Sequence, residues 1–437
     1  MAKKTTPKKD GQLPDVLDLI KGFDKEVDTV ANTESAQIEE YISSGSRILD
    51  ACLCGHICDN YGKDGKLTTC GSGWPKAKLL LIGGAPGSGK TFLACSFLKD
   101  AQKKGYSCII LDSENSIDQG FLERLGLDPN KVIIKKVSTI AEVISFMTKL
   151  CDALIDQKEK YGYCQPTIVS IDSASNLSSE KEIDDAVNMT GKKDFTKQQS
   201  NRQFARILLT KCANAGVTTI VLSHTYQSMD PYAGNGGQII SGGQGLQYAA
   251  SVTLTLSVSK LVDKANDAAG EKVVGKENRL KNGILVTARP SKSRYTIPHK
   301  VQFPISFYRP MDSMKNVGLE SYLTWENAGV AKGTMMSQKD FDKLSDADKQ
   351  KVESWELNGE QYHAVLKDTA RGIVVKHLGR TVSPVEFFGD EVFNEEFLRQ
   401  IDRDVFRPTF ELPSADSWDD VKEIQDLIGG DTEDESE

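Results

Sequence analysis

The chain alternates between short apolar runs and longer segments with apolar residues at helical spacing, and this alternation constrains the fold more than any other feature. Strands that alternate with helices form a parallel sheet covered by helices on both faces, and ligands bind beyond the carboxyl ends of its strands. The sequence therefore predicts an α/β fold with a mostly parallel, twisted sheet. The strand-like runs are Leu79–Ile82, Cys108–Leu111, Val132–Ile134, Thr167–Ile171, Thr219–Leu222, Val252–Val258 and Ile284–Thr287.

The first run leads into a glycine-rich turn, GGAPGSGKT, and then into a helical segment. The spacing fits G-x-x-x-x-G-K-[ST], in which backbone N–H groups cradle a polyphosphate at a helix N-terminus. Lys90 is expected to reach the β- and γ-phosphates of ATP, and the Thr91 hydroxyl to ligate Mg²⁺. A chance turn before a helix is the alternative, but it would not need every motif position filled. The candidate nucleotide-binding residues are Gly84, Ala85, Pro86, Gly87, Ser88, Gly89, Lys90 and Thr91.

Acidic residues follow two other predicted strands. Glu114 comes just after the second run, where a carboxylate beside the phosphate loop can take a proton from an attacking water. A solvated loop acid is the alternative for Glu114, and the nearby Asp112 is expected to be buried for structural reasons. Asp172 closes the fourth run and is predicted to hold Mg²⁺ together with Thr91. No N-K-x-D motif follows, which argues against a GTPase.

Polar residues and two loops follow the later strands. His224 lies where a side chain can sense the γ-phosphate, although a lone histidine is more often structural. The glycine-rich stretch Tyr226–Gly243 comes next, and a second polar stretch follows the Asp172 strand. We expect both loops to contact a nucleic-acid strand through backbone N–H groups and lysines, with plain solvent loops as the alternative. The candidate DNA-binding residues are Asn188, Gly191, Lys192, Lys193, Gly234, Asn235, Gly236, Gly237, Gly242 and Gly243.

The ends of the chain differ in composition from its middle. We expect an N-terminal arm over residues 1–45, an ATPase core over 46–315, a smaller α+β C-terminal domain over 316–415 with helix over Ser337–Glu356, and a disordered acidic tail over 416–437. The formal net charge is −8, and the tail carries ten acids against Lys422, a balance of −9, so the first 415 residues carry a net charge of +1. A basic surface on the body can therefore face an anionic polymer.

Cysteine usage and the N-terminus bear on the compartment. Nine cysteines in a long chain without an apolar signal segment indicate reduced thiols and an intracellular, cytoplasmic protein. No apolar run reaches the roughly 18 residues of a membrane span, so no membrane partner is expected. Zinc binding by Cys52, Cys54, Cys58 and Cys70 stays open, because their spacing fits none of the usual knuckles; a glycine-rich hairpin with incidental thiols is the favoured alternative.

In order along the chain, these segments resemble the RecA recombinase family, and more closely its phage branch, the UvsX recombinases. The likeness covers roughly residues 46–310 and rests on LDSENSID, IDSASNLSSEKEIDDA, SHTY and SGGQGLQYAAS beside the phosphate loop. It implies that Asp118 and Phe121 contact adenine. It also implies that Lys292 and Arg294 supply cations across a subunit interface to a neighbour's nucleotide, so that hydrolysis depends on assembly.

The resemblance implies a DNA-dependent ATPase that forms helical filaments on single-stranded DNA and pairs it with homologous double-stranded DNA. Mediator and single-strand-binding proteins are the accessory partners that it implies, and the cytoplasm of a bacterium or a phage-infected cell is the compartment that it implies. A ring-forming helicase with the same core is the runner-up, although only about 45 residues precede the core, where that class carries a further domain. A DNA-coating protein without hydrolysis is a third interpretation, against which the intact motif residues argue. The predicted catalytic residues are Glu114, Lys90, His224, Lys292 and Arg294.

Overall fold

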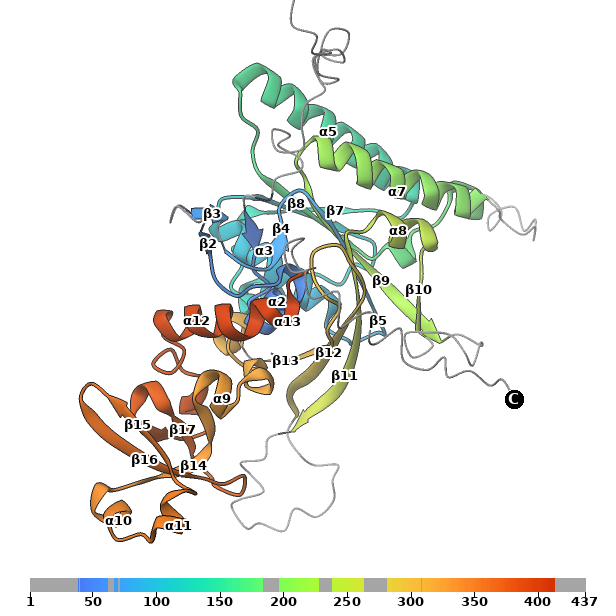
Figure 1. The fold of residues 1–437 in the computed structure, drawn as a ribbon. Coiled ribbons are helices and arrows are strands. Elements are labelled where there is room, and N and C mark those ends of the chain that lie inside the picture. The colour runs from blue at the N-terminus through green and yellow to red at the C-terminus, as the bar shows by residue number, and fades with distance from the viewer. Residues whose placement is uncertain are drawn as a thin grey trace, which may run out of the picture.

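A computed structural model describes residues 38, 40–61, 67–69, 71–183, 196–227, 238–262, 281–307 and 309–412 of the 437-residue chain. Its centre is a nine-stranded sheet with helices on both faces, and a five-stranded sheet lies to one side (Figure 1). The predicted α/β fold with a mostly parallel sheet is confirmed. None of the helices in the described ranges is both long and apolar enough to cross a membrane.

The central sheet follows the order β13-β12-β11-β5-β9-β8-β6-β7, with β10 paired to β9. Neighbours from β11 to β7 are parallel, whereas β10, β12 and β13 are antiparallel to their partners. All seven predicted runs are strands of this sheet, and the carboxyl ends of β5, β6, β8 and β9 therefore meet at one edge. The strands are β5 (Leu79–Gly84), β6 (Ser107–Asp112), β7 (Val132–Lys136), β8 (Thr167–Asp172), β9 (Thr218–Gln227), β10 (Gln238–Ile240), β11 (Val252–Val262), β12 (Lys281–Ser293) and β13 (Val301–Ser306).

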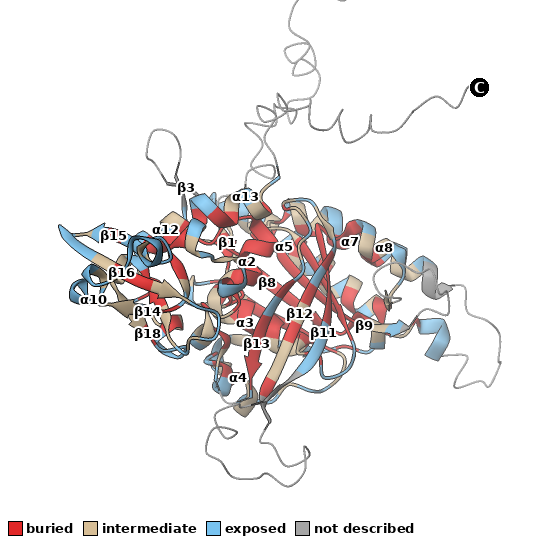
Figure 2. Cartoon of the chain, turned by 60° about the horizontal axis from the view of Figure 1, so that its bottom comes forward, coloured by how far each residue is buried: buried red, intermediate tan, exposed pale blue. Residues whose placement is uncertain are grey.

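The two faces of the sheet bury alternate residues of the same strands. In β5, Leu80 and Ile82 belong to one hydrophobic cluster, and Leu79 and Leu81 belong to the other. This follows from the alternation of side chains along a strand. Figure 2 shows the buried residues concentrated on the strands, between the helical layers. The first cluster includes residues of α2 (Arg47–Cys54), α3 (Lys90–Lys103) and α4 (Gln119–Leu125), and the second includes residues of α5 (Ile140–Tyr161), α7 (Thr196–Asn214) and α8 (Gln244–Ala249).

Helix α5 illustrates how local sequence sets these elements. Thr139 and Glu142 form a capping box at its start, because each side chain bonds to the other residue's backbone N–H. The helix ends at Gly162, whose φ of +70° is left-handed. Between these signals the buried residues recur every three or four positions, so one face packs against the sheet. They are Ile140, Val143, Met147, Cys151 and Leu154.

The C-terminal region forms a five-stranded antiparallel sheet in the order β15-β16-β14-β17-β18. The prediction of helix over Ser337–Glu356 is wrong in its last part, because the strand β15 buries Trp355 against the sheet and pairs with β16. The elements here are β14 (Val330–Met336), β15 (Glu353–Leu357), β16 (Glu360–Leu366), β17 (Ile373–Val375), β18 (Arg380–Val382), α9 (Trp325–Ala328), α10 (Gln338–Asp342), α11 (Asp346–Lys349), α12 (Glu395–Ile401), the π-helical turn η12 (Asp402–Phe406) and α13 (Arg407–Phe410). Single 3₁₀ turns occur at η3 (Pro129–Lys131), η4 (Ala174–Asn176), η8 (Met311–Met314), η9 (Leu319–Tyr322), η10 (Lys376–Leu378) and η11 (Glu386–Phe388).

The last described residues pack back on helix α2. The Ile57 N–H donates to Asp402 Oδ1 at 2.6 Å, and the Ile297 N–H donates to the Phe410 carbonyl at 2.9 Å. Buried Asp402 also pairs with Arg407 at 2.9 Å. Helices α12 and α13 therefore share a hydrophobic core with α2, although both the central sheet and the five-stranded sheet lie between them in sequence.

The described N-terminal residues join this core through small sheets. β1 (Tyr41–Ile42) pairs with β4 (Trp74–Pro75), and β2 (Asn60–Tyr61) pairs with β3 (Leu67–Thr69). Tyr106 Oη donates to Glu40 Oε2 at 2.6 Å, which ties this segment to the residues after α3. Most of the proposed arm and the whole acidic tail lie outside the described residues.

Candidate nucleotide site

The phosphate loop joins β5 to α3 through a turn whose backbone requires glycine. Gly87 has a φ of +73° and Gly89 a φ of +86°, both in the left-handed region. A Cβ on Gly84 would clash with the Ser88 side chain and lie 3.2 Å from the Leu256 carbonyl oxygen. The loop therefore has the tight conformation that places a helix N-terminus beside a phosphate.

Lys90 lies inside this loop. Its Nζ donates to the carbonyl oxygens of Gly84 at 2.9 Å and Ala85 at 3.1 Å, and it lies 3.4 Å from His224 Nδ1. Burial lowers the pKa of Lys90, while the nearby carboxylates of Glu114 and Asp172 tend to raise it. The ammonium group is thus held at the mouth of the turn, where it can meet the terminal phosphates.

Thr91 and Asp172 form the candidate magnesium site. The Thr91 hydroxyl donates to Asp172 Oδ2 at 2.6 Å, while Asp172 Oδ1 is buried and has no hydrogen-bond partner among the described residues. Burial raises the pKa of Asp172 to about 6, the Thr91 hydrogen bond opposes this shift, and the carboxylates of Glu114 and Asp112 add to it. A hydroxyl and a carboxylate with an unpartnered oxygen are hard ligands, so the pair fits Mg²⁺.

Glu114 and His224 face each other across the same edge. Glu114 Oε1 accepts from Ser173 Oγ at 2.6 Å and lies 3.0 Å from His224 Nε2. Asp112 is buried, and its Oδ1 accepts from the backbone N–H groups of Glu114 at 2.9 Å and Asn115 at 2.8 Å. Asp112 therefore shapes the turn that presents Glu114, which is only partly buried.

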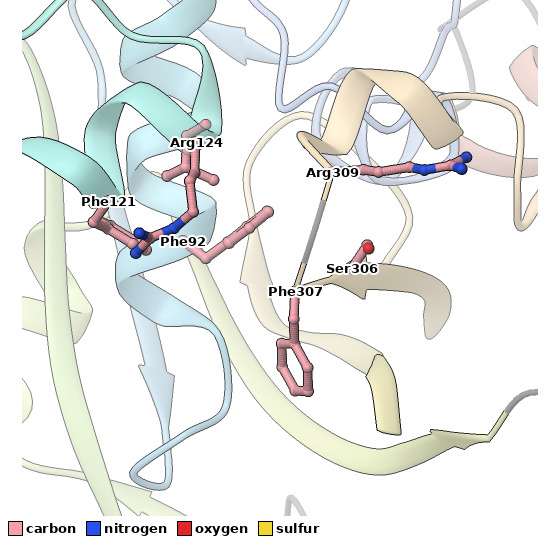
Figure 3. Close-up of a pocket in the computed structure, with 7 residues that line it drawn as sticks. Phe92, Phe121, Arg124, Ser306, Phe307 and Arg309 are labelled. Carbon is pink, nitrogen blue, oxygen red and sulfur yellow. The ribbon is translucent and has the colours of Figure 1, made fainter. Parts of the chain in front are cut away.

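A cavity of about 160 Å³ is lined in part by Phe92, the residue that follows the phosphate loop. Phe121 lines it, whereas the Asp118 carboxylate accepts from the Phe121 N–H at 2.8 Å and caps helix α4. Figure 3 shows side chains of α3 and α4 on one side of the cavity, and on the other side Ser306 at the end of β13 with Phe307 and Arg309 after it. Two aromatic walls with flanking arginines suit a flat, polar-edged base. The lining residues are Phe92, Phe121, Arg124, Leu125, Ser306, Phe307 and Arg309.

The predicted DNA loops are only partly described. Gly242 and Gly243 follow β10 with φ of +94° and +85°, and the Ser241 N–H donates to the His224 carbonyl at 2.8 Å. The hairpin of β9 and β10 is thus tied to the nucleotide site where the glycine loop begins and ends. The other candidates, Asn188, Gly191, Lys192, Lys193, Gly234, Asn235, Gly236 and Gly237, lie outside the described residues.

Lys292 and Arg294 lie away from the phosphate loop of their own chain. Lys292 pairs with Thr253, whereas Gly84 at the start of the loop pairs with Leu256, a separation of three residues, or about 10 Å along the strands. Lys292 Nζ donates to the three carbonyls of Gln247, Tyr248 and Ala250 at 2.7–3.0 Å, and burial lowers its pKa. Arg294 is exposed.

The cysteines near the N-terminus have separate surroundings. The Cys52 thiol donates to the His299 carbonyl at 3.5 Å and the Cys54 thiol to the Asp50 carbonyl at 3.1 Å. Both belong to helix α2, so their placement on a hairpin is wrong, although the antiparallel pair of β2 and β3 does lie between Cys58 and Cys70. In the described ranges no three His, Cys, Asp or Glu side chains are grouped to hold a metal ion, and Cys70 lies outside them.

Several residues of the site were not singled out from sequence. Ser173 and Ser175 follow Asp172 directly and could have been noted as polar residues at a strand end. Phe307 and Arg309 follow β13. This strand was not among the predicted apolar runs, so the two residues were not predicted as part of the site. Phe92 was not predicted because in the sequence it is one of several apolar residues of the α3 segment.

Comparison with known proteins places this geometry in a family. The model of the RecA N-terminal domain matches residues 21–293, which is more than half of the chain. Protein RecA of Malacoplasma penetrans (strain HF-2) is 26% identical over 69% of this chain and 78% of its own length. The recombination and repair protein of Enterobacteria phage T4 is 26% identical over 47% of this chain, which spans about half (49%) of that relative. The DNA repair protein recA homolog 1 of Arabidopsis thaliana chloroplasts is 25% identical over 66% of this chain and 57% of its own length. With its phosphate loop, acidic strand ends and parallel sheet in the matched region, this chain belongs to the RecA N-terminal domain family.

Proposed function

We propose that this protein is an ATP-dependent recombinase, a DNA-dependent ATPase that assembles on single-stranded DNA and pairs it with a homologous duplex. The observation that carries the proposal is a single connected site at one sheet edge of a RecA-family chain: Lys90, Thr91, Asp172, Glu114 and His224. The similarity of this chain to a protein named RecA and to a phage protein named recombination and repair protein supports the proposal.

The side chains divide the work of hydrolysis between them. Lys90 offers its ammonium group to the β- and γ-phosphates, while the loop N–H groups hold the oxygens. Thr91 and Asp172 would hold Mg²⁺, which when bound neutralises charge on the phosphate oxygens. Glu114 takes the proton of the attacking water, and the contacts described above fix the direction of its carboxylate. His224 lies between Glu114 and Lys90, so it is placed to respond to the γ-phosphate.

The cavity lined in part by Phe92 is the proposed adenine site. Phe121 on α4 and Phe307 after β13 supply aromatic surface on its two sides (Figure 3). Asp118 caps the helix that carries Phe121 and so holds that wall in place. Stacking against such rings stabilises a base by about 1 kcal/mol or more.

The loops beyond β8 and β9 are the proposed DNA contacts. Lys192 and Lys193 would meet phosphates, and the glycines around Gly236 and Gly242 let the backbone approach the strand. The base of the second loop is bonded to His224, which links DNA contact to the nucleotide site.

Assembly completes the site in this proposal. Lys292 and Arg294 lie towards the amino ends of the parallel strands, so they are better placed for a neighbouring subunit's nucleotide than for their own. A cation brought by a neighbour stabilises charge on the transferring phosphoryl group, which makes turnover depend on a helical filament. Mediator and single-strand-binding proteins are the further partners that we propose.

Electron microscopy and a pairing assay test the proposal together. With single-stranded DNA and a non-hydrolysable ATP analogue the protein should form helical filaments, and with ATP it should pair that strand with a homologous duplex. Lys90→Ala should lose both activities. Lys103→Ala, the same change at the exposed far end of α3, should keep them. Closed rings without pairing would contradict the proposal.

A further inference from the structure

Four residues at the candidate site form a closed ring of hydrogen bonds. Ser173 Oγ donates to Glu114 Oε1 at 2.6 Å, and Ser173 Oγ lies 2.8 Å from Ser175 Oγ. The His224 backbone N–H donates to Ser175 Oγ at 3.2 Å, and His224 Nε2 lies 3.0 Å from the same Glu114 oxygen. The ring joins residues that are 110 positions apart in sequence.

The direction of every bond in the ring is fixed by its members. An ionised Glu114 can only accept, so Ser173 donates to it and has no second proton to give. Ser173 must therefore accept from Ser175, which in turn accepts from the backbone N–H of His224. In the neutral imidazole of His224, an Nε2 that donates to Glu114 leaves Nδ1 unprotonated, and Nδ1 can then accept from Lys90 at 3.4 Å. No member can reverse without breaking a neighbouring bond.

The His224 backbone also anchors the hairpin of β9 and β10. Its carbonyl accepts from the Ser241 N–H at 2.8 Å, and Ser223 Oγ donates to the Ser241 carbonyl at 2.8 Å. The backbone of His224 therefore meets Ser175 through its N–H and Ser241, the residue after β10, through its carbonyl. A shift of either side changes the orientation of both.

We infer that Ser175 is a positioning residue that holds the catalytic base Glu114, through Ser173, in register with the root of the glycine loop. The inference rests on the proposed function. Ser175 lies in the short turn η4 and is only partly buried, whereas Ser173 is fully buried. Ser175 thus fills no core space, and its hydroxyl is the part of the side chain that acts.

The central test compares Ser175→Ala with Ser175→Thr, which keeps the hydroxyl. Removing one such bond should lower kcat of the DNA-stimulated ATPase about three- to tenfold, with the KM for ATP within about twofold of wild type. The ratio of kcat with and without single-stranded DNA should fall as well. Ser175→Thr should restore kcat. Ser178→Ala, a change three residues further on and outside the ring, should match wild type. Unchanged kcat in Ser175→Ala would overturn the inference.

Coupling within the ring distinguishes positioning from general structure. Ser173→Ala and the double variant with Ser175→Ala should lose nearly the same kcat, because both changes break one connected path; fold-losses that multiply would contradict this. Amide hydrogen exchange at His224 should quicken in Ser175→Ala and in Ser173→Ala but not in Ser175→Thr. This exchange is measured without ATP or DNA, so unaltered exchange in the alanine variants would refute the ring whatever the ATPase activity. A wild-type protein without DNA-stimulated turnover would count against the proposed function alone.

Discussion

Replacing Glu114 with glutamine separates the chemical role of this side chain from its structural role. Glutamine has the same length and shape, and its amide oxygen can still accept from Ser173 Oγ and from His224 Nε2, the two donors that now meet Glu114 Oε1 at 2.6 and 3.0 Å. The amide cannot take a proton from water. Glu114→Gln should therefore leave the site assembled and remove only water activation.

The two effects differ in size. Hydrogen bonds to a charged group contribute about 1.5–3 kcal/mol and bonds to a neutral group about 0.5–1.5, so neutralising the acceptor weakens the two bonds by roughly 2 kcal/mol in total. This loss of hydrogen-bond energy affects the arrangement of Glu114, Ser173 and His224 and does not affect the phosphate loop. General-base catalysis is worth about 10²–10⁴-fold in rate, or roughly 3–5 kcal/mol of barrier. We expect kcat to fall by about 10²–10⁴ with little change in the KM for ATP.

Steady-state ATP hydrolysis on single-stranded DNA measures both constants. The variant should also leave DNA more slowly than wild type in the presence of ATP, because ATP persists in the filament. Glu123→Gln, an exposed change on helix α4, is the matched control and should behave as wild type. A Glu114→Gln protein whose kcat stays within tenfold of wild type would refute the assignment of Glu114 as the base.

Three further outcomes are expected. Arg294→Ala should bind nucleotide but lose DNA-stimulated turnover, and mixing it with Lys90→Ala should recover part of the activity; no recovery at any ratio would exclude action across subunits. Phe121→Ala should raise the KM for ATP with kcat nearly unchanged, measured in the same assay. Burial raises the pKa of Asp50 from 3.8 to about 7, so the folded state holds this proton more tightly than the unfolded chain. The protonated Asp50 side chain contributes roughly 4 kcal/mol to the free energy of unfolding below about pH 4, and this contribution is lost as the pH rises to about 7. Urea unfolding of Asp50→Asn across this range should show a flatter pH profile, and an unchanged slope would contradict the assignment.

Most of the central sheet was predictable because its inner strands, such as β5 and β8, are buried on both faces, although the edge strand β7 is mainly exposed. Each predicted run is a local stretch of Val, Ile and Leu, and such runs are visible without knowing their partners. The five-stranded sheet was not predicted. Its strand β15 reads ESWEL, with Trp355 as its buried residue, and it is stable only because β16 lies beside it. The charged residues on the exposed side of β15 resemble the polar face of a helix, and the segment was therefore predicted as helix.

Within the site, the sequence by itself determined the phosphate loop. The left-handed turns at Gly87 and Gly89 and the start of α3 at Lys90 depend on conformations and hydrogen bonds among a few neighbouring residues. Tertiary structure alone decided which polar strand ends meet. Parallel pairing of β6 with β8 aligns Asp112 with Asp172, pairing of β5 with β9 aligns Gly84 with His224, and these registers bring Glu114 and His224 together. Hydrogen bonds between distant strands and the packing of both sheet faces set those registers, and neither is encoded in any short stretch of the chain.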